Sequence, residues 1–586
     1  MIAKKLKRIP VGISDYKTII DKDMFFVDKT LFIEEIFNTD GHVKLISRPR
    51  RFGKTLNMSM LKCFFEKTIN SRTGEHTENL NTHLFTDKKI WQCPDMVKEQ
   101  GQWPVIFLSF REIKEMNWTL AYEKICSFIF LEFDRHRYLL DSDKLTAKEK
   151  KDLKSILSEN TTRSNIDQSL KFLTKFLFAH HKKKVIVLID EYDTPINYSY
   201  KNGYYEEMIN FSHSLFHSVL KDNEYLKFGV VTGVMRMAKE GIFSGLNNLS
   251  VFGVTDDRFA DKFGFTQNEV DDFLTEYGFQ NRKAEVKEWY DGYQIGFKKV
   301  VANLYNPWSV IQFVSTDGRI NTYWDNTSDT KILQDVIAFS EVSLKKNIDL
   351  LIQGEEIIEK IDEGIVFIGI ERNKKASWSL MLFAGYLTIS DRIGFEADNN
   401  YKLTIPNREI LYSIRKLVET AFNKTITTEK MQQLLSAIKK GDEEKFEEIF
   451  QDFIFSSVSM YDFTEDEPEK SYHLFVLGML VTFSDEYEVK SNRESGDGRY
   501  DILMAPLNKT QPGIIIEFKK ADRKENLDAA ADAALQQIQD KRYTQELRAK
   551  GIKDVIAFGV ACKQKKVLVK MRRGDEIDKK IKGFKI

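Results

Sequence analysis

The chain has 586 residues, of which 42% are hydrophobic and 30% are charged. This composition excludes a protein that is disordered as a whole, and the length predicts several domains of about 150 residues each. Acidic and basic residues number 88 each, so the net charge of +0 gives no direct sign of a nucleic-acid partner, although it is compatible with a local basic face.

The cysteines and the apolar stretches indicate the cellular compartment in which the protein resides. Four cysteines lie far apart and form no CxxC pair, which argues against a zinc site or a disulfide framework and fits a reducing compartment. The basic N-terminus is followed by no apolar signal segment, and the longest apolar stretches fall short of the roughly 20 residues that span a bilayer. We therefore predict a cytoplasmic protein without a membrane segment.

Four short apolar runs in the first 255 residues predict buried strands. They are His42–Ser47, Pro104–Phe110, Lys184–Asp190 and Leu226–Gly233. Each run is separated from the next by enough chain for at least one helix. The pattern therefore predicts an α/β fold with a parallel sheet and helical crossovers.

A candidate phosphate-binding loop follows the first of these strands. The sequence SRPRRFGKTLNMSML places Gly53, Lys54 and Thr55 at the start of a helix, where backbone N–H groups and the helix dipole attract phosphate oxygens. Lys54 would bridge the β- and γ-phosphates, and the Thr55 hydroxyl would ligate Mg²⁺. Arg48 stands where the usual GxxxxGK[ST] pattern has glycine, and the alternative is a helix start with an ordinary exposed lysine.

The run Lys184–Asp190 ends in two carboxylates, as the second half of such a site requires. Asp190 would hold Mg²⁺ through water, and Glu191 would polarise the attacking water. The alternative is an acidic strand end that faces solvent. A strand–GKT–helix followed by a strand–Asp–Glu is much rarer than either motif alone, so the pair favours nucleotide binding.

A further strand ends at Thr232 and is followed by Arg236. A polar residue at this strand end would sense the γ-phosphate, and Arg236 would neutralise charge in the transition state. The alternative for Arg236 is a surface ion pair.

Motifs over residues 9–328 together resemble one family. They are GISDYKTI, FFVDKT, SRPRRFGKTLNMSML, VIVLIDEYD, TGVMRMAKEGIFSGLNN, FGFTQNEV, WYDGY and YNPWSV, and together they resemble the bacterial AAA-ATPase-like family. In that family the RPRRFGK[ST] loop is the usual P-loop, which accounts for Arg48. The resemblance implies a P-loop ATPase of the AAA or STAND type, with a lid after the core and with ATP and Mg²⁺ as cofactors. The nucleotide-binding candidates are Arg51, Gly53, Lys54, Thr55, Asp190 and Arg236.

AAA-type sites are often completed by an arginine from a neighbouring subunit. Arg258 is a weak candidate for this role, which would require a homo-oligomer.

The C-terminal region predicts a second site. Two strand-like segments, 500–505 and 513–519, are joined by a polar turn. Because strand side chains alternate between faces, Glu517 and Lys519 share one face, and Asp501 on the partner strand can lie close to Glu517. Asp501 and Glu517 would bind Mg²⁺, while Lys519 would orient the attacking water or stabilise the phosphate.

This arrangement resembles the D-x(n)-ExK core of the PD-(D/E)xK nuclease superfamily. The helix 527–543 carries Gln537 and Tyr543 and resembles the corresponding helix of Holliday-junction-resolvase-like members. The resemblance implies that Gln537 contacts the metal-bound water or the backbone phosphate. Upstream, SYHLFVLGML resembles the family's opening helix, and Glu469 or His473 would supply an extra ligand, with capping or packing as the alternative.

The two resemblances together predict an α/β protein in four parts. These are a P-loop core (1–255), a lid or winged-helix-like subdomain (256–330), a helical connecting region (331–463) and a nuclease-like domain (464–586). The expected function is ATP binding and hydrolysis joined to Mg²⁺-dependent cleavage of DNA, gated by ATP. The alternatives are a STAND-like signalling switch whose C-terminal domain binds a partner, and a nuclease fold that binds nucleic acid without cutting it.

Overall fold

The computed structural model describes most of the chain from Leu6 to Ile577. The segments outside the description are 71–73, 76, 78, 159–161, 236–241, 244, 298–302, 325–341, 363, 365–373, 396–397, 424–426, 458–474, 476–477, 480–481, 492–493, 496–497, 522–525 and 564–565. The chain divides into two compact units. Unit 1 comprises Met1–Asn326 and Ile358–Ile410, and unit 2 comprises Thr327–Ile357 and Leu411–Ile586.

Unit 1 is built on a five-stranded parallel sheet, which confirms the predicted fold class. The strands are β1 (Val43–Ser47), β2 (Val105–Ser109), β3 (Val185–Asp190), β4 (Leu226–Gly233) and β5 (Leu249–Phe252), in the order β2-β3-β4-β1-β5. Every residue of β1 and β3 is buried, because helices cover both faces of the sheet. The short edge strand β5 was not predicted.

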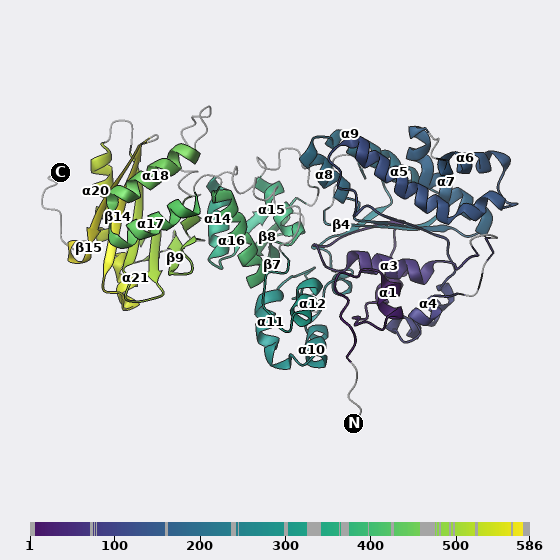
Figure 1. The fold of residues 1–586 in the computed structure, drawn as a ribbon, viewed down its shortest axis with the longest axis horizontal. Helices are drawn as coiled ribbons and strands as arrows, with labels where there is room; N and C mark the ends of the chain where they lie inside the picture. The colour runs from purple at the N-terminus through teal and green to yellow at the C-terminus, as the bar shows by residue number, and fades with distance from the viewer. Residues whose placement is uncertain are drawn as a thin grey trace, which may run out of the picture. The chain divides into compact units, whose positions relative to one another are not determined.

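The helices of the core lie on opposite faces of this sheet. Helices α5, α7 and α9 lie on one face, and α1, α3 and α4 lie on the other (Figure 1). Side chains cap several of them; Thr146 and Glu149, for example, form a reciprocal capping box at the start of α6. The helices are α1 (Tyr16–Asp21), α2 (Leu31–Asn38), α3 (Lys54–Phe65), α4 (Pro94–Glu99), α5 (Trp118–Arg135), α6 (Ala147–Leu157), α7 (Arg163–His181), α8 (Thr194–Asn202) and α9 (Tyr205–Leu220).

Three short helices follow over the residues for which we predicted a lid, and we call them the lid helices. They are α10 (Gln267–Glu276), α11 (Lys283–Tyr290) and α12 (Pro307–Ser315), and they share one apolar cluster. The rest of unit 1 contains α15 (Lys374–Ala384) and a three-stranded sheet in the order β6-β8-β7, except for Ile357 at the start of β6. Its strands are β6 (Ile357–Lys360), β7 (Thr388–Ile393) and β8 (Asn400–Thr404). The connecting region is therefore largely helical, as predicted, but also includes this sheet.

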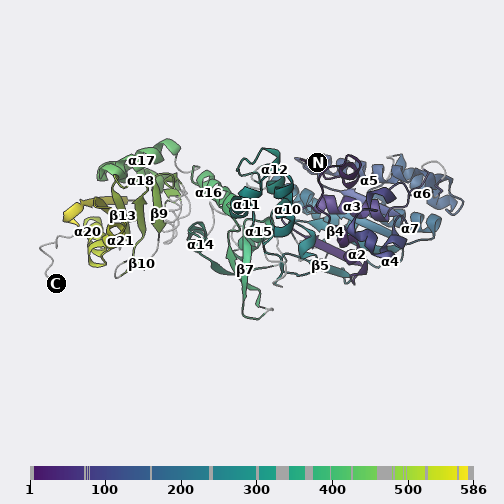
Figure 2. The same cartoon turned by 90° about the horizontal axis from the view of Figure 1, so that it is seen from below.

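Unit 2 contains a mixed sheet in the order β15-β14-β13-β12-β9, in which only β13 and β14 run parallel. Helices α17 and α18 lie on one side of this sheet, and α20 and α21 lie on the other (Figure 2). The strands are β9 (Tyr487–Ser491), β12 (Ile502–Pro506), β13 (Gly513–Lys520), β14 (Val555–Lys563) and β15 (Lys566–Arg573). The helices are α14 (Val342–Ile352), α17 (Thr428–Lys440), α18 (Glu443–Ser457), α20 (Leu527–Asp540) and α21 (Thr544–Ala549), and α16 (Arg408–Asn423) begins in unit 1 and continues here.

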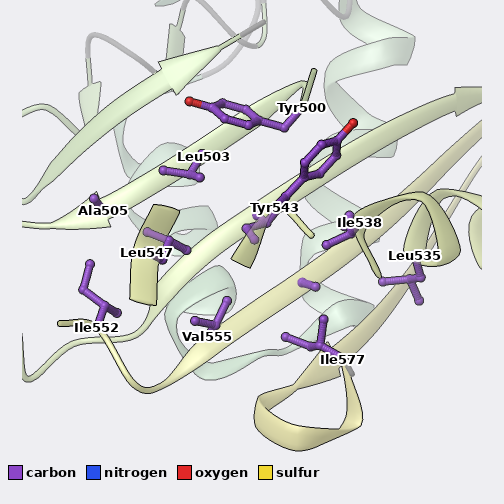
Figure 3. Close-up of a cluster of buried hydrophobic side chains, with 12 residues drawn as sticks. Tyr500, Leu503, Ala505, Leu535, Ile538, Tyr543, Leu547, Ile552, Val555 and Ile577 are labelled. Carbon is purple, nitrogen blue, oxygen red and sulfur yellow. The ribbon is translucent and has the colours of Figure 1, made fainter. Parts of the chain in front are cut away.

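Helix α20 packs very close to the sheet of unit 2. Its buried face carries Ala530, Ala531 and Ala534, and a Cβ atom added at Gly559 on β14 would lie 2.4 Å from the Ala531 carbonyl oxygen. Small residues thus allow close backbone approach. An apolar cluster continues this contact, with the rings of Tyr500 and Tyr543 5.8 Å apart (Figure 3).

Candidate functional sites

The loop after β1 has the geometry of a phosphate-binding loop. Gly53, with a positive φ of 84°, precedes α3, and Lys54 is the first residue of that helix. The Lys54 Nζ donates to the carbonyl oxygens of Arg48 and Pro49, both at 3.2 Å, and lies 3.6 Å from a Glu191 carboxylate oxygen. The structure therefore brings the lysine of the loop and the carboxylate after β3 together at one edge of the sheet.

Asp190, at the end of β3, is the meeting point of three hydroxyl groups. Its carboxylate accepts hydrogen bonds from Thr55 Oγ1 at 2.9 Å, Ser109 Oγ at 3.1 Å and Thr232 Oγ1 at 2.8 Å. Burial raises the pKa of Asp190, the charge of Glu191 adds to this, and the hydroxyl donors partly oppose it. A buried carboxylate next to a threonine hydroxyl fits a hard, oxygen-binding cation such as Mg²⁺.

The residues just after Glu191 fasten the segment that follows β4. The buried Asp193 carboxylate accepts hydrogen bonds from the backbone N–H groups of Val234 at 2.8 Å and Met235 at 3.0 Å, and the Tyr192 hydroxyl donates to the Met235 carbonyl at 2.6 Å. Burial raises the pKa of Asp193 to about 6, with the charge of Glu191 as the second cause. Sequence reasoning missed Asp193, although the acidic cluster in VIVLIDEYD is a signal for it.

Arg48 has a structural position in this loop. Its guanidinium is fully buried and donates to the carbonyl oxygens of Ser47, Phe252, Gly253 and Arg258. Burial lowers its pKa to about 10. The arginine thus joins the base of the loop to the end of β5, which explains why the position usually held by glycine carries a long donor side chain.

Two other arginines, Arg51 and Arg258, make contacts with residues of the predicted lid region. The Arg51 guanidinium donates to the Tyr323 carbonyl and lies 4.8 Å from the centre of the Trp308 ring. Arg258 pairs with Asp256 at 3.1 Å, and its side chain is 59% exposed. Arg51 therefore contacts the lid region in this structure, and the role that we predicted for it at the nucleotide remains a proposal.

The second candidate site lies where β12 begins and β13 ends. The backbone N–H of Asp501 donates to Glu517 at 3.3 Å, and the backbone N–H of Phe518 donates to the Asp501 carboxylate at 2.8 Å. Gln537 of α20 donates to the other Glu517 oxygen and lies 3.5 Å from the Tyr543 hydroxyl. The structure therefore brings together the two carboxylates and the glutamine that the sequence singled out.

The electrostatics of this pair favour a bound cation. Glu517 is only 3% exposed, and burial raises its pKa to about 9, with the charge of Asp501 as the second cause. Two adjacent carboxyl groups that resist ionisation together are stabilised by a divalent cation. Within the described residues no group of three or more His, Cys, Asp or Glu side chains gathers. Asp501 and Glu517 are the two carboxylates here that could hold such a cation, with water completing its shell.

Two family comparisons match these two sites. Residues 10–243 match the family described as predicted AAA-ATPase, and residues 467–572 match the PD-(D/E)XK nuclease superfamily. The chain joins an AAA-ATPase-like domain to a PD-(D/E)XK superfamily domain. Both matches agree with the resemblances stated from the motifs.

Two individual proteins also resemble this chain. One is described as an uncharacterized protein in the vnfD 5' region of Azotobacter chroococcum mcd 1; it is 24% identical over 565 residues, which cover 93% of this chain and 94% of that protein. The other is the structure of the Walker-type ATPase PABY2304 of Pyrococcus abyssi, with 12% identity and a TM-score of 0.31, covering 70% of this chain and 99% of that one.

A pocket of about 540 Å³ lies beside the carboxylate pair of the PD-(D/E)XK domain. Lys519, Ala533, Gln536, Gln537, Asp540, Lys541 and Tyr543 line it. Lys519 lines this pocket, and its positive charge acts to lower the pKa of Glu517. A basic side chain at this place would attract an anionic substrate.

Some predicted residues lie outside the described part of the chain. They are Arg236 in the AAA-ATPase-like domain and Glu469 and His473 before the PD-(D/E)XK sheet. Where the helices are described, none combines the length and the apolar composition that crossing a bilayer requires.

Proposed function

We propose that this protein binds and hydrolyses ATP in unit 1, cleaves DNA with Mg²⁺ in unit 2, and controls the cleavage through the nucleotide. The observation that carries the proposal is that, in each unit, motif residues from different strands and helices meet in one place. Thr55 bonds to Asp190, and Asp501 bonds to the strand that carries Glu517. The support for DNA, rather than another phosphodiester, is the resemblance to resolvase-like nucleases.

In the ATPase site each residue has a defined task. The backbone N–H groups at the start of α3 hold the phosphate oxygens, and Lys54 exchanges its carbonyl partners for the β- and γ-phosphates. Thr55 and Asp190 would hold Mg²⁺, which supplies neutralisation of phosphate charge. Glu191, held beside Lys54, orients the water that attacks the γ-phosphate.

In the nuclease site, Asp501 and Glu517 would hold Mg²⁺, which supplies Lewis-acid activation of the scissile phosphate. Lys519, two residues after Glu517 on the same face of β13, orients the attacking water and stabilises the charge of the phosphate. Gln537 fixes the orientation of Glu517 through its hydrogen bond. The pocket next to Lys519 then receives the nucleotide beside the cleaved bond.

We also propose domain boundaries for the chain. The nuclease domain itself spans 464–586, close to the matched residues 467–572, and α14, α17 and α18 add to it within unit 2. The core and the lid keep the proposed limits 1–255 and 256–330, and residues 358–410 of the connecting region complete unit 1. Residence in the cytoplasm and assembly into a homo-oligomer through Arg258 also stay proposals.

The test is Mg²⁺-dependent cleavage of labelled single-stranded, duplex and branched DNA, with and without ATP. We expect the wild-type chain to cut, Lys519→Ala to cut at least about 100-fold more slowly, and chelation of Mg²⁺ to stop cleavage. The matched control is Lys520→Ala, which removes the exposed lysine next along β13 and should leave the rate unchanged.

Two outcomes would contradict the proposal. If cleavage survives in Lys519→Ala, the assigned site is not responsible for it. If no substrate is cut although ATP is hydrolysed, the chain acts as a nucleotide-dependent signalling switch whose C-terminal domain only binds.

A further inference from the structure

We infer that the nucleotide state of the P-loop reaches the nuclease unit through a junction formed by Arg51, Tyr323, Trp324, Ser309 and Glu409. The inference rests on the proposed function, because it names the route by which ATP regulates cleavage. Here "the junction" means these five residues, all of which belong to unit 1.

The P-loop is fastened to the lid region along its outer side. The Arg50 carbonyl accepts a hydrogen bond from the Asn306 side chain at 3.2 Å, and the Phe52 carbonyl accepts one from the Gly264 N–H at 3.2 Å. The Phe52 ring also meets the Tyr293 ring edge-to-face at 5.0 Å. Any rearrangement of the loop around phosphate must therefore move the lid region or break these contacts.

Arg51 connects the loop to the last described residues before unit 2. Its guanidinium donates to the Tyr323 carbonyl, and the Trp308 indole N–H donates to the same carbonyl at 3.1 Å. The guanidinium also lies over the Trp308 ring, 4.8 Å from its centre, where the face of the ring attracts the cation. Arg51 itself has a positive φ of 65°, so the loop holds it in a conformation that non-glycine residues seldom adopt.

Glu409 binds two segments that are distant in the sequence. One carboxylate oxygen accepts a hydrogen bond from the Trp324 N–H at 2.9 Å, and the other accepts one from Ser309 Oγ at 2.7 Å. Glu409 is fully buried, and Trp324 beside it is 1% exposed and packs edge-to-face on Tyr386 at 4.7 Å. Burial of a carboxylate costs desolvation free energy, and these two hydrogen bonds offset part of that cost.

The junction lies next to two points where the chain passes from unit 1 to unit 2. The chain passes from unit 1 to unit 2 after Asn326 and again after Ile410, and Trp324 and Glu409 stand just before these two crossings. Glu409 lies in the first turn of α16, the helix that continues into unit 2. One hydrogen bond, from Trp324 to Glu409, thus links the segments that precede these two crossings, and one side chain, Arg51, links them to the P-loop. This is a contiguous physical path of the kind that can carry energetic coupling.

The experiment follows α16 by hydrogen exchange in the full-length chain, with Mg²⁺ and a non-hydrolysable ATP analogue. In the wild type we expect analogue binding to change the exchange of residues 408–423. In Glu409→Gln and Ser309→Ala we expect that change, and the effect of ATP on cleavage, to shrink at least about fivefold, while affinity for the analogue stays within about threefold. The matched control is Glu288→Gln, which removes an exposed partner of Arg408 at the same helix start and should behave as the wild type.

The outcomes separate the inference from the proposed function. Absence of analogue binding by the wild type would overturn the proposed ATPase. Binding without any response of α16 would overturn the junction and leave the ATPase intact. If Glu409→Gln does not fold, Ser309→Ala and Trp308→Phe, which each remove one donor, decide the question, and full coupling in both would overturn the inference.

Discussion

Burial is the main cause of the raised pKa of the carboxylates at the two candidate sites. Glu517 illustrates this, because burial beside Asp501 raises its pKa to about 9, so at neutral pH the cation-free site keeps a proton. A divalent cation binds the ionised form and must displace that proton. The affinity for Mg²⁺ or Mn²⁺ should therefore rise as pH rises from about 6 towards 9.

Calorimetry in buffers of different ionisation enthalpy measures the proton released on binding. We expect close to one proton per cation at pH 7 for the wild type and none for Glu517→Gln, which carries no titrating group at this position. A cation affinity that does not change with pH over this range would contradict the prediction.

Arg48 gives a second test at the scale of one residue. Arg48→Gly restores the usual P-loop glycine but deprives four carbonyl oxygens of their buried donor. We expect the free energy of unfolding of the chain to fall by on the order of 3 kcal/mol, measured by chemical denaturation. Arg258→Ala removes an exposed guanidinium nearby and should change it by less than about 1 kcal/mol. Equal effects of the two substitutions would show that Arg48 does not hold the loop.

Among the elements, α18 covers β15, the edge strand of the sheet in unit 2. The backbone N–H groups of Val567, Val569 and Met571 on β15 donate to side chains of Gln451, Glu447 and Glu443 on α18, at 2.9, 2.9 and 2.7 Å. Four helix residues advance about 6 Å and two strand residues about 6.7 Å, so the two spacings match closely. The helix thereby satisfies donors that an open edge strand would offer to another chain.

Removal of these acceptors should expose the edge. We expect the double variant Glu443→Ala, Glu447→Ala to lose on the order of 1 kcal/mol per hydrogen bond and to self-associate more readily, as measured by denaturation and light scattering. The Glu→Gln changes keep an acceptor oxygen and should be mild, and Glu444→Ala on the exposed face is the control. Unchanged stability and association in the double alanine variant would contradict this role.

At the scale of the whole molecule, the two sites belong to different compact units joined by three crossings of the chain. Lys54→Ala removes the cation that we propose to bind the phosphates, so we expect ATP hydrolysis to fall at least about 100-fold. The ratio of cleavage rates with and without ATP should then approach one. If that ratio remains as in the wild type, ATP does not control cleavage through this site.

The sequence by itself determined the fold class and both sets of candidate motif residues. Apolar runs such as 185–189 mark strands buried on both faces, and alternation along a strand places Glu517 and Lys519 on the same face; both are local patterns. The roles of these residues stay predictions, and Arg236, Glu469 and His473 lie outside the described residues.

The tertiary structure alone decided the partners of these residues. Ser109, Asp193 and Glu409 act through contacts with segments 41 to 100 residues away, and no local pattern reveals such contacts. It also placed a three-stranded sheet in the connecting region, which we predicted to be helical, because side-chain packing overrides propensity in short strands. The periodicity of apolar residues along the chain determines which segments form helices and strands. Buried polar groups need hydrogen-bond partners, and the fold determines which distant residues become those partners.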